Sequence, residues 1–265
     1  MNKQLTFLLF ILLTACNTSK VKTVSSKPIV DKQLCDSLSK SIETAYQNKS
    51  DEGLTAFLDN WNESISNKNE SLIKSQIEKD IYAIYKELFK PNTISTICES
   101  YFDNAFYENE NFFIIQSGVR YDIENERTEE INIDSLPSIW DFRPKIEIDN
   151  AKILYLTIDY EKVLTDFLNN NSLKPKSKNL VDNINAKPER YKREDFLETK
   201  LKIFPWHWGK NWHLATHPEI EIVYFSSNRK KANVGYRIEY SSWNAEFMKK
   251  NGRWTIINIE QTGYE

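Results

Sequence analysis

The chain has 265 residues and a formal net charge of −3, from 35 basic and 38 acidic side chains. Charges of both signs are interspersed, so the sequence contains no basic stripe and no nucleic-acid partner is expected. The six glycines form none of the glycine-rich patterns that bind nucleotide phosphates, and no cofactor is expected.

The first 15 residues have the three parts of a secretory signal peptide. Lys3 supplies a positive charge, and Leu5–Leu13 is a nine-residue apolar run, too short to span a bilayer of about 30 Å. The sequence Leu13-Thr14-Ala15-Cys16 follows, and it resembles the lipobox of bacterial lipoprotein precursors at all four positions. This resemblance implies cleavage before Cys16, acylation of Cys16 and a membrane anchor outside the cytoplasm.

Residues 16–30 are predicted to form a flexible tether, because they are polar and rich in Ser, Thr and Lys. Residue 17 is Asn and not the Asp that marks inner-membrane retention in many Gram-negative lipoproteins. By resemblance to that sorting rule, the outer membrane is favoured if the source is Gram-negative. Nothing after Cys16 approaches 18 consecutive apolar residues, so no spanning helix is expected.

Residues 31–92 are predicted to form three antiparallel helices. The first covers Asp31–Gln47, and the second begins at the capping pair Ser50-Asp51. The third, Asn69–Lys90, carries an apolar stripe and ends before Pro91. Short polar connections between the helices make an antiparallel arrangement the simplest interpretation.

Two cysteines, Cys35 and Cys98, follow the lipidation candidate. An oxidising envelope would allow them to form a disulfide between the first helix and the segment after the third. The alternative is two separate buried thiols, because the sequence does not place the two Cα atoms within disulfide reach.

Residues 93–265 are predicted to be rich in strands and continuous with the helices in one domain. Hydrophobic patterning predicts strands at Phe112–Ile115, Val119–Ile123 and Lys152–Ile158, helices at Asp159–Asn169 and Pro188–Glu198, and an exposed loop at Asn170–Lys187.

The last third alternates most clearly. In Ala232–Tyr240 every second residue is apolar, which indicates a strand with one buried face. Asn251-Gly252 predicts a type I′ hairpin that pairs Lys249 with Trp254, Phe247 with Ile256 and Ala245 with Asn258. The predicted fold is therefore α+β, with N-terminal antiparallel helices packed on a curved, mainly antiparallel C-terminal sheet.

The run Lys231–Ile259 contains an A-x-V-x-Y strand and a K-K-N-G-R-W hairpin. It loosely resembles the closing strands of the NTF2-like, cone-shaped α+β domains. This resemblance implies a pocket between the sheet and the helices, and it carries over no catalytic residue.

One cluster of residues suggests a site. All three histidines and three of the seven tryptophans lie within twelve residues: Trp206, His207, Trp208, Trp212, His213 and His217. Imidazoles bind metals and indoles stack on ligands, so the cluster is a candidate ligand-binding site. No H-E-x-x-H pattern is present, no metal is expected, and bracing of the core is the favoured interpretation.

No catalytic motif is found, although Glu219 and Glu221 alternate along a predicted strand as paired carboxylates would. The leading hypothesis is a non-enzymatic lipoprotein that binds a small ligand or an envelope protein. The alternatives are an envelope hydrolase acting on a polymer or glycan, and a structural or immunity lipoprotein.

Overall fold

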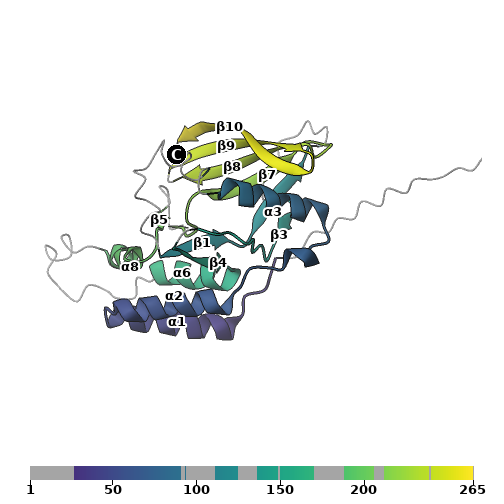
Figure 1. Ribbon diagram of the computed structural model, residues 1–265. Coiled ribbons are helices and arrows are strands. Elements are labelled where there is room, and N and C mark those ends of the chain that lie inside the picture. The colour runs from purple at the N-terminus through teal and green to yellow at the C-terminus, as the bar shows by residue number, and fades with distance from the viewer. Residues whose placement is uncertain are drawn as a thin grey trace, which may run out of the picture.

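The computed structural model describes residues 27–90, 93, 111–124, 136–148, 150–169, 188–205, 212–238 and 240–264. The signal peptide, Cys16 and most of the tether lie outside these residues. Figure 1 shows a helical layer on one side, a twisted sheet on the other, and a short two-stranded sheet between them. No helix within the described ranges is long and apolar enough to cross a membrane.

The first two predicted helices are confirmed and lie side by side (Figure 1). Helix α1 spans Lys32–Gln47 and α2 spans Asp51–Ser64. The carboxylate of Asp31 and the hydroxyl of Ser50 cap them by accepting hydrogen bonds from first-turn N–H groups. Helix α2 buries its apolar face completely, through Leu54, Phe57, Leu58 and Trp61.

The prediction of one long third helix was wrong. The segment forms a short 3-10 helix, η1 (Glu70–Leu72), and then α3 (Gln76–Leu88). The Ser75 hydroxyl accepts a hydrogen bond from a first-turn N–H and starts α3 anew, so the apolar stripe does not continue through Leu72, which is 71% exposed. Helix α3 packs against the sheet, where it contacts strand β10 (Figure 1).

A parallel pair of strands separates two hydrophobic cores. Strand β1 (Phe112–Gln116) pairs in parallel with β4 (Lys152–Leu156). On β1, Phe112 and Ile114 belong to the helical core, whereas Phe113 and Ile115 belong to the core beneath the large sheet. Because both faces of β1 are buried, its sequence is an uninterrupted apolar run.

The helical core is completed by two further helices, both close to their predicted positions. Helix α6 (Ile158–Leu168) contacts α1, and α8 (Glu189–Glu198) contacts α6. The guanidinium of Arg193 is fully buried there and forms two hydrogen bonds with Glu43, at 2.7 and 2.9 Å. This bidentate pair joins α8 to α1.

The large sheet has six strands in the order β10-β9-β8-β7-β2-β3. All neighbours are antiparallel except β2 and β7, so the α+β class is confirmed. Its strands are β2 (Val119–Ile123), β3 (Ser138–Ile139), β7 (Glu219–Phe225), β8 (Lys231–Ile238), β9 (Ser241–Lys250) and β10 (Arg253–Tyr264). Strands β5 (Phe204–Pro205) and β6 (Trp212–His213) form a separate antiparallel pair.

The C-terminal hairpin forms as predicted near its turn. Asn251 and Gly252 have φ of 50° and 80°, the positive values that a type I′ turn requires. Two predicted pairs, Lys249 with Trp254 and Phe247 with Ile256, are confirmed. The third is wrong: a bulge after Ile256 shifts the register, and Ala245 pairs with Ile259 instead of Asn258.

Candidate functional site

The Trp–His cluster is described in part. Trp206, His207 and Trp208 lie outside the described residues, so nothing structural is assigned to them. Trp212 and His213 form β6, and His217 lies just before β7. Trp212 packs against the helical core, and its indole N–H donates a hydrogen bond to Asn169 at 3.2 Å.

Both described histidines are enclosed. His213 is 2% exposed and its Nδ1 lies 2.6 Å from Glu219 Oε2, whereas His217 is fully buried and its Nδ1 lies 3.0 Å from the carbonyl oxygen of Arg237. A carbonyl only accepts hydrogen bonds, so Nδ1 of His217 carries the proton. Burial lowers the pKa of His217 to about 4, so this imidazole is neutral at pH 7.

The segment that carries these histidines is hydrogen-bonded to strand β1, which lies between the two hydrophobic cores. Thr216 and Ile114 exchange two hydrogen bonds of 2.9 Å, one to the backbone carbonyl of Ile114 and one to the Thr216 hydroxyl. The side chain of Gln116 then binds both the N–H and the carbonyl of Ile220. These contacts define the point at which β7 begins, next to the cis peptide bond between His217 and Pro218.

The two strand carboxylates bind different partners. Glu219 pairs with His213, whereas Glu221 accepts a hydrogen bond of 2.8 Å from Arg237 on the neighbouring strand β8. A bulge after Ile220 interrupts the register between them. No cluster of metal-ligating side chains is found in the described part of the chain.

A third carboxylate, Glu161 on α6, has an altered titration. Burial raises the pKa of Glu161, and Glu219 raises it further, while Lys27 lowers it. The residue is nevertheless exposed to solvent.

The Cys35 thiol is buried against α6. Its sulfur lies 3.7 Å from the Asp159 carboxylate, and burial, followed by the charge of Asp159, raises the pKa of Cys35. Such a thiol is a poor nucleophile. Cys98 lies outside the described residues, so the disulfide stays a prediction.

Asp80 is a buried carboxylate that sequence reasoning missed. The Asp80 carboxylate is 3% exposed and binds Lys249 Nζ at 2.5 Å and the Trp254 indole N–H at 3.2 Å. It holds α3 to the β9–β10 hairpin. Its position gave a signal, because Asp80 occupies the same helical face as Ile77, Ile81 and Ile84.

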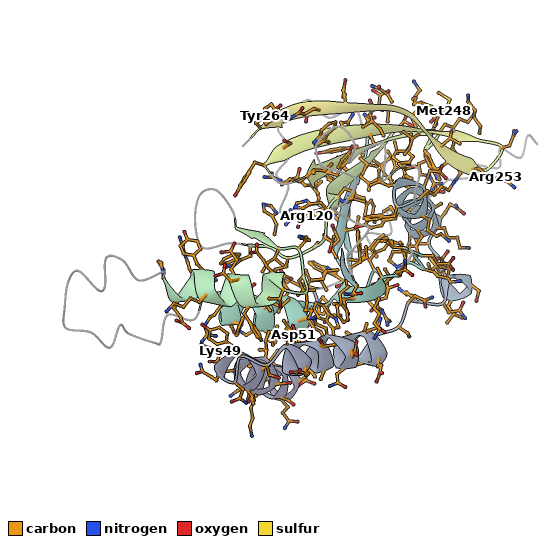
Figure 2. The ribbon with its side chains drawn as sticks, turned by 60° about the vertical axis from the view of Figure 1, so that its left-hand side comes forward. Lys49, Asp51, Arg120, Met248, Arg253 and Tyr264 are labelled. Atoms are coloured by element: carbon orange, nitrogen blue, oxygen red, sulfur yellow. The ribbon has the colours of Figure 1, made fainter. Side chains whose placement is uncertain are left out.

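Strand β10 lies at the margin of the sheet. Within the described ranges it pairs only with β9, through ten of its twelve residues. Figure 2 labels its two ends, Arg253 and Tyr264. Ile257 and Thr262 are the residues skipped by the two bulges, and both are exposed, Ile257 at 47%. The strand contains no proline and only two charged residues, so its two bulges are the main feature that protects this edge.

The chain matches no family model, no curated protein and no solved structure. The similarity of Lys231–Ile259 to NTF2-like domains stays a prediction.

Proposed function

We propose that this chain is a lipoprotein of the bacterial envelope whose α+β domain binds a partner protein along strand β10. In this proposal residues 1–15 are removed, Cys16 carries the lipid, and residues 16–30 tether the domain to a membrane outside the cytoplasm. The outer membrane is the site if the source is Gram-negative. The lipobox sequence Leu13-Thr14-Ala15-Cys16 supports the anchor.

The observation that carries partner binding is the single-sided pairing of β10. An edge strand presents a row of backbone N–H and C=O groups that an extended segment of another protein can pair with. The bulges at Ile257 and Thr262 divide this edge into short stretches. Bulges protect an edge against open-ended aggregation, so a partner segment would have to pair with the short stretches between them.

The Trp–His cluster supports a structural role more than a chemical one. His213 and His217 each bind a partner within the fold and are almost fully buried. A general base needs access to the proton that it removes, and neither imidazole offers that access in the described part of the chain. Partner binding is therefore favoured over the hydrolase hypothesis.

The test uses the full chain in its native membranes. A photoreactive residue at Ile257 is compared with one at Leu72, an exposed apolar position on η1, away from the sheet. We expect one adduct of defined mass from position 257 and none from position 72. Thr262 has no residue opposite it on β9, so Thr262→Pro should disturb the edge more than the pairing with β9; it should abolish the adduct and leave the unfolding midpoint unchanged.

Equal adducts from both positions would contradict the proposal, as would a 257 adduct that survives in the proline variant. If the domain bound only a small molecule, position 257 would give no protein adduct, which would also contradict the proposal.

A further inference from the structure

Two hairpin turns of the large sheet bring six basic residues to one end. The β7–β8 turn supplies Arg229, Lys230 and Lys231, and the β9–β10 turn supplies Lys249, Lys250 and Arg253. The turns are joined by a hydrogen bond of 2.8 Å from the Lys249 N–H to the Lys230 carbonyl. We call these six residues the basic hairpin end.

Pairing of the strands keeps these side chains close together. Lys231 neighbours Met248 across β8 and β9, and Lys250 is directly opposite Arg253. Since neighbouring strands are about 4.8 Å apart, the four strand ends lie within roughly 15 Å. Figure 2 shows Met248 and Arg253 at this end of the sheet, with Lys49 at the far side of the molecule.

Among the described residues, the positive charges of the basic hairpin end outnumber the acids beside them. Asp80 neutralises Lys249, and Glu124 borders the end through its backbone hydrogen bond to Phe225. Glu246 lies on the same face of the sheet as Lys231, at the next position of that face along the paired strands. Six positive charges less these three acids leave a formal +3 among the described residues, although the whole chain carries −3. Within the described ranges the five other basic side chains of this end form no ion pair.

The form of the surface identifies the anion that it suits. The cations lie in the β7–β8 turn and at the adjoining strand ends, and Lys230, Lys231, Lys250 and Arg253 are exposed. The two turns carry no aromatic residue on which a nucleic-acid base could stack. An extended array of headgroup phosphates matches this group of exposed basic side chains.

From this geometry we propose that the basic hairpin end binds the anionic phospholipid surface to which the chain is anchored. The proposal rests on the membrane anchor proposed above. A tether from Cys16 to Lys27 extends at most about 40 Å, which keeps the domain near that surface. Polybasic contact as a second attachment would fix the orientation of the domain and leave the edge of β10 accessible.

The experiment uses the chain from residue 16 onward with Cys16→Ser, so that no acyl group contributes. This chain contains every described residue. Co-sedimentation compares vesicles of equal parts phosphatidylglycerol and phosphatidylcholine with vesicles of phosphatidylcholine alone. We expect binding to the anionic vesicles only, and loss of that binding at high salt.

The triple variant Lys230→Gln, Lys250→Gln and Arg253→Gln should weaken this binding roughly a hundredfold, because each basic residue near an anionic surface contributes about a fivefold factor. The matched control replaces three exposed lysines of the helical layer, Lys32, Lys40 and Lys49, by Gln. It changes the net charge equally and should bind as the parent does.

Equal weakening in both triple variants would overturn the proposal, because bulk charge would then explain the binding. Tighter binding to a duplex DNA oligonucleotide than to the anionic vesicles would overturn it too. Failure of the anchor is recognised separately, as the absence of acyl mass on Cys16 in cells, whatever the vesicles show.

Discussion

Protonation of His217 should destabilise the fold at mildly acidic pH. The imidazole is fully buried, and burial lowers its pKa from 6.5 to about 4. The smaller influences are the Arg237 carbonyl and Glu219, which raise the pKa, and His213 and the Arg237 charge, which lower it. Because the folded pKa is the lower one, the unfolded chain takes up the proton first. The contribution of His217 to the free energy of unfolding is therefore fully present above pH 6.5, and it is lost as the pH decreases towards 4.

The size of the effect follows from the two pKa values. At pH 4.5 an unfolded histidine of pKa 6.5 is almost fully protonated, whereas His217 in the fold is mostly neutral. The free energy of unfolding should then be about 2.5 kcal/mol lower than at pH 7 from this residue alone.

The assay is urea unfolding of the parent chain and of His217→Gln at pH 7 and pH 4.5. Glutamine can still donate a hydrogen bond to the Arg237 carbonyl and does not titrate, so the variant should lose about 2.5 kcal/mol less over this interval. Hydrogen bonding to Arg193 lowers the pKa of Glu43, so the stability that Glu43 contributes is lost mainly below the pH interval of this assay. Glu161, whose raised pKa acts in the opposite direction, is common to both proteins and cancels. Equal losses in the two proteins would refute the reasoning.

Two further pairs of substitutions test the packing of the hairpin. Gly252→Val should lower the free energy of unfolding by about 1–3 kcal/mol, because φ is +80° at this position. No neighbour lies within 4 Å, so a clash adds nothing to this cost. Gly263→Val, which lies outside the positive-φ region, should cost much less in the same denaturant titration. Asp80→Ala should cost about 3–5 kcal/mol by removing the acceptor of Lys249 and Trp254, and Asp80→Asn, which keeps an acceptor for the indole, should cost clearly less; equal midpoints for both would contradict this account.

Features determined by nearby residues could be predicted from the sequence. The cap at Ser50, the alternation in β8 and the Asn251-Gly252 turn each depend on contacts a few residues apart, and all of them formed. The α+β class follows from these elements. The bulge after Ile256 was not predicted, although it reverses the alternation along β10: the less exposed positions are Trp254 and Ile256 before the bulge and Ile259 and Gln261 after it.

Features determined by distant residues were not predictable. Arg193 lies in a strongly charged segment, yet it is fully buried because Glu43, 150 residues away, binds it. The partner of His217 is a backbone carbonyl on another strand, which no side-chain pattern records. Likewise, the apolar run around Ile114 predicted a strand. It did not predict that this strand separates two cores, because its parallel partner lies 40 residues further along the chain.

The same reasoning explains the basic hairpin end. Its six cations fall in two clusters of three about 20 residues apart, and each cluster alone is an ordinary charged turn. Only the pairing of β8 with β9 places them together.

The anchor is tested most directly by the intact mass and N-terminal peptide of the chain extracted from bacterial membranes. The account predicts that the mature chain begins at Cys16 and carries the mass of a diacylglyceryl thioether on that residue, with Cys16→Ser lacking it. A mature chain that begins elsewhere, or an N-terminal Cys16 peptide of unmodified mass, would contradict it.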